Sequence, residues 1–180
     1  MPLADPIPFV DAETAIGQIL RTAAETLAPV EAERLRRATA VDRRVWSGSG
    51  GARAVPVVGR LGVKAADGSD MLEVLRVIVA AVRAGLTVEL SLGRPLADRL
   101  HRGLLRAGAS VRVETADRWA ARAGGAYERI RVVGPERSRR AALRRAASRA
   151  PQAVIDVDAV DLEGTAEIER LLGPRALIHA

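Results

Sequence analysis

The residues best suited to chemistry lie in 127–148, where a short alternating strand, a Gly134-Pro135 turn and an arginine-rich helix follow one another. A glycine between a strand and a helix is a common way to bring backbone N–H groups and the positive end of a helix dipole to a phosphate. The same connection also occurs in α/β proteins that bind no nucleotide. A phosphate-binding turn at Gly134 is therefore the first hypothesis that this segment raises.

The helix after this turn separates a charged face from an apolar one when it is projected at about 3.6 residues per turn. The charged face holds Arg137, Arg140, Arg144, Arg145 and Arg149, and the apolar face holds Ala142, Leu143, Ala146 and Ala147. A solvated surface is the favoured interpretation of such a charged face. The alternatives are that Arg137 and its neighbours hold an anion, or that the face contacts a protein or RNA through its guanidinium groups.

Acidic and histidine side chains supply the next candidates. Asp156 and Asp158 lie in the segment VIDVDAV, at the carboxyl end of an expected strand, where α/β proteins place their sites. They are the best acidic candidates, and the alternative is that they cap the next turn. His101 and His179 are the only histidines and have no carboxylates at metal-ligand spacing, so we interpret both as structural or exposed and expect no metal site.

The sequence contains no serine or cysteine in a pattern typical of nucleophilic catalysis. Ser49, in the segment WSGSGG, lacks the glycine two positions before it that a nucleophile elbow requires. The chain has no cysteine, which excludes thiolate nucleophiles, disulfides and cysteine-ligated metals and fits a reducing cytoplasm. We interpret Trp46, Trp119 and Tyr127 as packing residues whose polar tips reach the surface.

The composition is that of a soluble globular protein with a basic balance. Hydrophobic residues make up 48% of the chain and charged residues 28%, and the formal net charge is +6. The basic residues are almost all arginine, with Lys64 the only lysine, so genome composition explains this bias as well as a polyanionic partner does. Aromatic residues make up only 2%, which disfavours single-stranded nucleic acid, because stacking usually holds its bases. The longest apolar run, 77–82, is too short to cross a bilayer, so we expect a cytoplasmic protein without a membrane partner.

Two kinds of element must position these residues. Residues 1–46 predict a helical pair, and the small polar residues of 47–54 predict a flexible linker. From residue 55 to residue 180, strand and helix patterns alternate, with turn residues between them. Such alternation predicts right-handed βαβ units. The expected fold is therefore an α/β, Rossmann-like domain with a mostly parallel sheet and helices on both faces, preceded by two helices.

The order of the segments AVRAGLTVELS, GLLRAGASVRVE and YERIRVVG resembles the coenzyme domain of the aldehyde dehydrogenase superfamily. More closely, it resembles the non-catalytic segment at the C-terminal end of bifunctional proline dehydrogenase / L-glutamate γ-semialdehyde dehydrogenase (1-pyrroline-5-carboxylate dehydrogenase) enzymes. The likeness spans residues 12–180. It implies a Rossmann-like domain with NAD chemistry in the active members and a packing role in the silent segment.

Departures from the family pattern decide which functional residues carry over. Where the family strand ends in Lys-Pro-Ser-Glu on the adenosine ribose, this chain has Ser91, Leu92, Gly93 and Arg94. Ser91 is therefore at most a vestigial coenzyme contact.

This chain also departs from the family pattern at the turn that binds the coenzyme phosphates. The family continues after its first glycine with Ser-Thr-x-x-Gly, whereas Gly134 is followed here by Pro135 and Glu136, and Arg139 stands near the place of the second glycine. Proline offers no N–H, and the glutamate adds negative charge in the first turn. Gly134 is therefore a second vestigial candidate, and Asp156 or Asp158 is a loose match to the catalytic glutamate, with no glycine pair after it.

The resemblance and its departures together predict a catalytically silent domain associated with the conversion of proline to glutamate. Its partner would be a catalytic dehydrogenase module or a further copy of itself, held through packing surfaces. Thiohemiacetal chemistry is impossible without a cysteine, so we expect neither an enzyme in its own right nor a cofactor. One alternative is an independent domain that binds NAD or another nucleotide, and a second alternative is a basic RNA- or DNA-binding adaptor.

Overall fold

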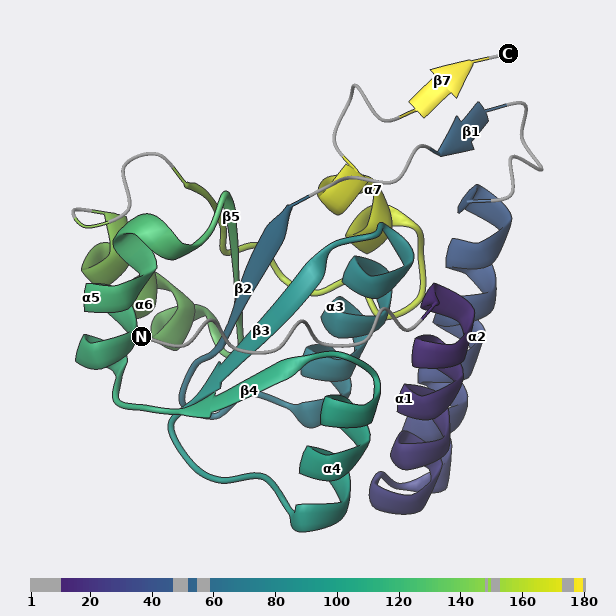
Figure 1. Ribbon diagram of the computed structural model, residues 1–180, viewed down its shortest axis with the longest axis horizontal. Helices are drawn as coiled ribbons and strands as arrows, with labels where there is room; N and C mark the ends of the chain where they lie inside the picture. Colours follow the sequence, from purple (N-terminus) through teal and green to yellow (C-terminus); the bar gives the residue numbers. More distant parts are fainter. Residues whose placement is uncertain are drawn as a thin grey trace, which may run out of the picture.

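The computed structural model describes residues 11–46, 52–54, 59–147, 149, 153–172 and 177–179 (Figure 1). Five parallel strands form its sheet: β2 (Arg60–Ala65), β3 (Thr87–Leu92), β4 (Ser110–Val113), β5 (Arg129–Val133) and β6 (Val154–Asp156). The helices are α1 (Ala12–Thr26), α2 (Pro29–Trp46), α3 (Met71–Arg83), α4 (Asp98–Arg106), α5 (Ala116–Ala126), α6 (Glu136–Ala147) and α7 (Ala166–Leu172). The predicted α/β fold with two preceding helices is confirmed.

The strand order β4-β3-β2-β5-β6 makes the sheet doubly wound. The chain runs outward from β2 to β4, crosses back, and adds β5 on the other side of β2. The connections diverge between β2 and β5, and this topological switch point is where open α/β sheets usually bind ligands, beyond the carboxyl ends of the strands.

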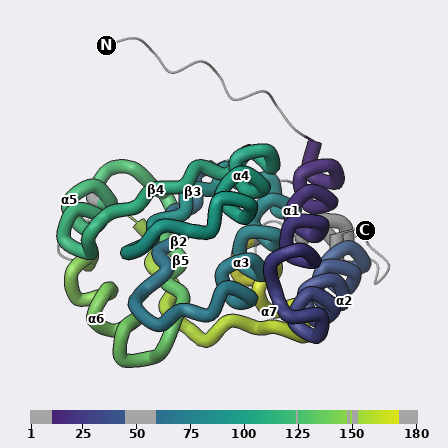
Figure 2. Tube along the Cα trace, turned by 90° about the horizontal axis from the view of Figure 1, so that it is seen from below, coloured from purple at the N-terminus to yellow at the C-terminus, as the bar shows by residue number. Residues whose placement is uncertain are grey.

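Helices cover both faces of the sheet (Figure 2). On one face, α3 and α4 pack on the strands, and α1, α2 and α7 pack outside α3. On the other face, α5 and α6 enclose a smaller core around Trp119, Ile130 and Val132. Because α3 has neighbours on all sides, its apolar residues are buried around its whole circumference, as its sequence predicts.

Local signals set the helix ends. The side chain of Asp11 accepts a hydrogen bond from the N–H of Thr14 at 3.1 Å, and that of Asp70 accepts one from Leu72 at 2.9 Å, so both act as N-caps. Gly85 follows α3 with a φ of 86°, a left-handed conformation that favours glycine, and so ends that helix.

Ion pairs of two buried arginines of α3 join the N-terminal helices to the sheet domain. Arg76 of α3 and Asp42 of α2 are both fully buried and form a bidentate pair, and Arg83 of α3 pairs with Glu13 of α1. Of the predicted linker, residues 47–51 lie outside the described part of the chain, and Ala52–Ala54 forms β1, which pairs antiparallel with β7 (Leu177–His179). Ser49 and the side chains of Trp46 and His179 also lie outside it. No helix in the described ranges has the length and apolar character needed to cross a membrane.

Candidate functional site

The turn after β5 is closed by a side chain from the turn after β2. Gly134 has a φ of 129°, and a Cβ placed on it would meet Oγ of Ser69 at 2.7 Å. The Ser69 hydroxyl donates to the carbonyl oxygens of Ala66 and Val133, at 2.8 Å from the latter. Ser69 therefore fills the space beside Gly134 that a bound phosphate would need.

Pro135 closes the same region from the other side. A Cβ on Gly68 would lie 3.2 Å from Cγ of Pro135, so the proline ring packs directly on the turn after β2. Proline has no N–H to donate. Arg139 turns back on its own helix start, where its Nη1 donates to the Gly134 carbonyl at 2.9 Å. The two turns at the switch point thus pack on each other and leave no glycine-lined cradle between them.

Ser91 lies apart from this turn. It is buried in β3, and the strand register places it beside Lys64 of β2, while Lys64 in turn lies beside Val132 of β5. Its hydroxyl oxygen accepts a hydrogen bond from Nζ of Lys64 at 3.4 Å. The structure therefore separates the two vestigial coenzyme candidates, Ser91 and Gly134, by a strand.

Lys64 is the residue whose surroundings suggest a site, although its sequence context did not mark it as one. Its side chain is 4% exposed and lies on the face of the sheet covered by α5 and α6, with Nζ 5.8 Å from the centre of the Trp119 ring. Burial lowers the pKa of Lys64, opposed by the negative charges of Glu114 and Asp67. A lysine that is buried without an ion pair among the described residues carries a desolvation cost that an apolar side chain would not.

A cavity of about 420 Å³ opens beside Lys64, at the carboxyl ends of β2 and β3, next to the start of α5 and along α6. Its lining residues are Lys64, Ala66, Asp67, Gly93, Thr115, Ala116, Arg137, Ser138, Ala141, Ala142 and Arg145. It lies on the α5 and α6 side of the closed switch point. Three cationic side chains and one carboxylate give the lining a positive balance.

A buried polar network extends from the same layer along the sheet. Glu89 of β3 accepts hydrogen bonds from the Tyr127 hydroxyl at 2.7 Å and from Nε of Arg112 at 2.8 Å, and Arg122 pairs with Glu89 and Glu114. Burial raises the pKa of Tyr127 to about 12, helped by the Glu89 carboxylate. Burial alone would raise the pKa of Glu114, but hydrogen bonds from Arg122 and Ser91, together with the positive charges of Arg122 and Lys64, outweigh it and hold that pKa below its usual range.

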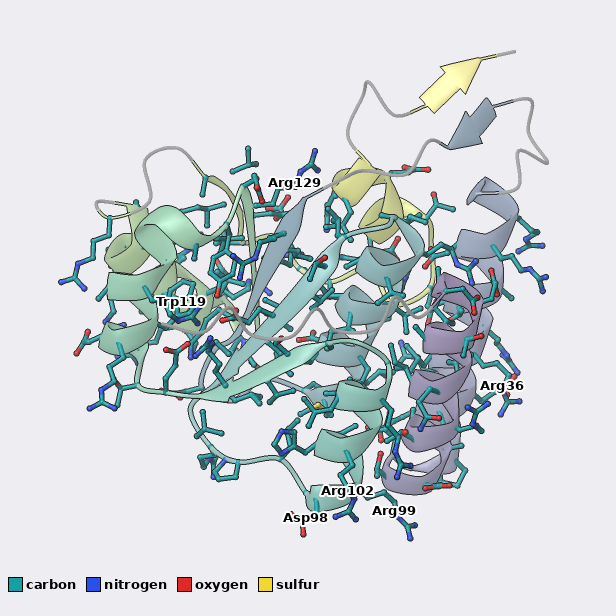
Figure 3. The ribbon with its side chains drawn as sticks, viewed as in Figure 1. Arg36, Asp98, Arg99, Arg102, Trp119 and Arg129 are labelled. Atoms are coloured by element: carbon teal, nitrogen blue, oxygen red, sulfur yellow. The ribbon has the colours of Figure 1, made fainter. Side chains whose placement is uncertain are left out.

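The predicted exposure of the aromatic polar tips is wrong for two residues. Trp119 is fully buried between α5 and the sheet, and its Nε1 has no hydrogen-bond partner in the described structure (Figure 3). The Tyr127 ring packs on Gly62, where a Cβ would meet it at 2.7 Å, and its hydroxyl ends inside on Glu89. Both rings lie in the interior because α5 packs directly on the sheet, and Glu89 of that sheet accepts the hydrogen bond of the Tyr127 hydroxyl.

The other sequence candidates have structural partners. Oδ1 of Asp156 accepts from the N–H of Asp158 at 2.9 Å, which is the turn cap that the sequence offered as the alternative, and Arg131 lies 3.4 Å from the same oxygen. Asp158 follows β6, so the two aspartates do not share that strand. His101 is partly buried in α4. No group of three metal-ligating side chains occurs within the described ranges.

The charged face predicted for α6 is exposed, and Ala142 and Ala146 are buried as predicted. Ala147 is exposed, contrary to prediction, and it is the last residue of the helix. Only Arg137 and Arg145 of the charged face line the cavity, while Arg140 pairs with Glu136 on the helix surface.

A second hollow, of about 340 Å³, lies between α1 and α4. Its basic residues are Arg21, Arg99, Arg102 and Arg106. Arg99 and Arg102 project from the start of α4 (Figure 3), and Nε of Arg99 lies 3.6 Å from Glu25. Exposed arginines paired in this way are typical of a solvated surface, so this hollow is the weaker candidate.

The fold and the closed switch point define a doubly wound, Rossmann-like α/β protein. Comparison with models of known protein families finds none that matches the chain, and no curated protein matches it significantly. The resemblance to aldehyde dehydrogenases therefore rests on the short sequence motifs given above.

One sequence signal could have identified Lys64. It is the only lysine among 28 basic residues, and it stands in the apolar strand segment LGVKAA. Where codon bias favours arginine throughout, a lysine at a buried strand position is conspicuous. The chemical difference is that lysine loses its proton on burial far more readily than arginine does.

Replacing Lys64 by methionine is expected to raise the free energy of unfolding at pH 7 by about 1–2 kcal/mol, because it removes a buried charge without an ion pair and keeps the shape of the side chain. The folded state releases this proton at a lower pH than the unfolded chain, whose value is near 10.5. The free energy of unfolding of the unaltered protein should therefore rise with pH in the window below 10.5, relative to the variant. Urea denaturation of both proteins between pH 7 and pH 10 measures this difference. A methionine variant that is less stable than the unaltered protein at every pH from 7 to 10 would contradict the prediction.

Proposed function

We propose that this chain is a catalytically silent, Rossmann-like domain of the aldehyde dehydrogenase type. Its proposed role is in the conversion of proline to glutamate, where it packs on a catalytic dehydrogenase module. The observation that carries the proposal is the closed switch point, where Ser69 fills the space beside Gly134 and Pro135 packs on Gly68. A dinucleotide needs glycines there so that backbone N–H groups reach its pyrophosphate. A fold kept without that cradle is consistent with a domain retained for assembly.

An uncovered sheet edge supports the packing role. In the described part of the sheet, β4 has a neighbour only on the β3 side. Val113 of β4 is 52% exposed, and Leu105, on the helix α4 that packs on β4, is also an exposed large apolar residue. An edge strand with free backbone groups and apolar side chains is a template for pairing with another chain. We place the contact with the dehydrogenase at this edge.

Replacing Val113 by glutamate is expected to weaken the complex with the 1-pyrroline-5-carboxylate dehydrogenase of the same organism by at least about tenfold, because it puts a charge into an apolar contact. Size-exclusion chromatography and biolayer interferometry with the two purified proteins measure the effect. Dehydrogenase activity, followed with and without the chain, reports whether packing changes the enzyme. The free energy of unfolding of the isolated variant should change by less than about 0.5 kcal/mol, because the side chain is exposed.

Val30 of α2 offers a matched control, since it is 67% exposed but lies on a helix that packs on the far side of α3. Val30→Glu should leave the complex unchanged. The proposal fails if no complex forms and the activity stays the same. A thermal-shift titration with NAD and NADH tests the alternative of a nucleotide-binding domain, and a saturable rise in Tm would favour it.

A further inference from the structure

The cavity beside Lys64 is lined by cationic groups from a strand and from a helix. Lys64 reaches it from β2, and Arg137 and Arg145 reach it from α6. The one carboxylate in the lining belongs to Asp67, which is exposed, whereas Lys64 is almost completely buried. The formal charge of the lining is thus positive, and Lys64 is its most buried cation.

These cations have unused hydrogen-bonding capacity. The ammonium group of Lys64 has three donors, and its only hydrogen-bond partner among the described residues is Ser91 Oγ, at 3.4 Å. Arg137 has no hydrogen-bond or ion-pair partner within the described part of the chain, and Arg145 has only a long contact of 3.6 Å with Asp117. Donors gathered without acceptors in this way fit an acceptor supplied by a ligand.

The remaining lining suits a compact oxyanion better than a nucleobase. Ser138 and Thr115 add hydroxyl groups, and the first turn of α6 adds the positive end of a helix whose early N–H groups have no intrahelical partner. Glu136, which would oppose an anion there, is paired with Arg140 one turn along the helix. The lining residues include no aromatic ring on which a base could stack. A volume near 420 Å³ is at the small end of the range for small-molecule sites.

We propose that this cavity binds a small phosphate-bearing molecule, with the phosphate held between the ammonium group of Lys64 and the guanidinium group of Arg137. The phosphate accepts hydrogen bonds from donors that the protein leaves unpaired, and burial strengthens the hydrogen bond from Lys64, whereas Arg137 is exposed. The site gives the domain a ligand of its own. The phosphate site does not depend on the proposed packing role, which uses the edge of β4 that faces away from β3.

The single lysine makes a covalent test possible. Pyridoxal 5′-phosphate carries a phosphate and an aldehyde: the ε-amine of Lys64 adds to the aldehyde carbon, water leaves, and an imine forms. Borohydride then delivers hydride to the imine carbon and leaves a stable secondary amine, which peptide mass spectrometry locates. Pyridoxal lacks the phosphate but closes largely to an internal hemiacetal, so the labelling rate of Lys64 by each reagent is divided by the rate at the N-terminal amine before the two reagents are compared.

Relative to the N-terminal amine, pyridoxal phosphate is expected to label Lys64 at least about tenfold faster than pyridoxal does. While the amine of Lys64 attacks the aldehyde, Arg137 still holds the phosphate, and one such charge-assisted hydrogen bond supplies an advantage of that size. Inorganic phosphate should slow the reaction in a saturable way, and potassium chloride at the same ionic strength should not. Glycerol 3-phosphate that competes at lower concentration than inorganic phosphate would identify a phosphate ester as the natural ligand. Equal competition by the two would identify the free ion.

Variants on one helix separate the site from general charge. Arg137→Gln should remove most of the advantage of pyridoxal phosphate, whereas Arg140→Gln, on the same helix but outside the cavity, should preserve it. A second measurement does not depend on labelling: phosphate should raise Tm relative to chloride at matched ionic strength, and Arg137→Gln should abolish the rise. Equal labelling by both reagents, or no phosphate-specific rise in Tm, would overturn the proposal. Protection of Lys64 by NAD but not by phosphate would also overturn it and assign the cavity to a dinucleotide.

Discussion

Replacing Asp42 by alanine is expected to lower the free energy of unfolding by about 3–5 kcal/mol, since it leaves the Arg76 guanidinium buried without its counter-ion. Both side chains are fully buried, and Nη2 of Arg76 lies 2.8 Å from Oδ1 of Asp42. The other donors of Arg76 bind the carbonyl oxygens of Asp161 and Gly164 at 3.0 and 3.1 Å. The guanidinium group is therefore held between α2 and the segment before α7, and it cannot move to water without disturbing both.

Urea denaturation measures this loss, and two controls define its cause. The double replacement Asp42→Leu with Arg76→Met removes both charges and should cost far less than Asp42→Ala alone, because well-packed apolar side chains often replace a buried pair without loss. Glu33→Ala breaks the exposed pairs of Glu33 with Arg36 and Arg37 on the same helix and should change stability by less than about 1 kcal/mol. A loss in Asp42→Ala no larger than in Glu33→Ala would show that solvent reaches Arg76.

The pair also marks the limit of what the sequence could predict about the fold. The periodicity of 71–83 predicts a buried helix, and α3 is buried on every side. The same pattern gives no reason for an arginine within that helix, because its partner stands 34 residues away in α2. Hydrophobic periodicity therefore predicted the elements and their layers, whereas the choice of buried polar partners depends on how the elements pack in three dimensions.

The candidate site shows the same division. Gly134 stands in a strand-turn-helix connection, so its place at the carboxyl edge of the sheet follows from the pattern alone. Whether that turn is open depends on Ser69, which comes from another βα unit, and no local rule links the two positions. Arg137 was recognisable as a possible anion ligand from its helix face. Its counterpart Lys64 stands out in the sequence as the only lysine, but the face of the sheet toward which it points is known only once the helices on each face are known.

Replacing Gly134 by alanine is expected to lower the free energy of unfolding by about 2–4 kcal/mol, from overpacking combined with an unfavourable backbone conformation. The added Cβ would lie 2.7 Å from Oγ of Ser69, and the φ of 129° is one that side chains other than glycine rarely adopt. In a Ser69→Gly background the steric contact is gone, so the same replacement should cost about 1–2 kcal/mol less, which a double-mutant cycle measures as coupling.

Gly125→Ala provides the matched control for this cycle. Gly125 lies in α5, and a Cβ there would meet nothing within 4 Å, so alanine should stabilise the protein by about 0.5–1 kcal/mol through helix propensity. The same chemical change should thus have opposite signs at the two glycines. If Gly134→Ala costs the same with and without Ser69, the serine does not fill the turn. The closed switch point, on which the proposed assembly role rests, would then lose its support.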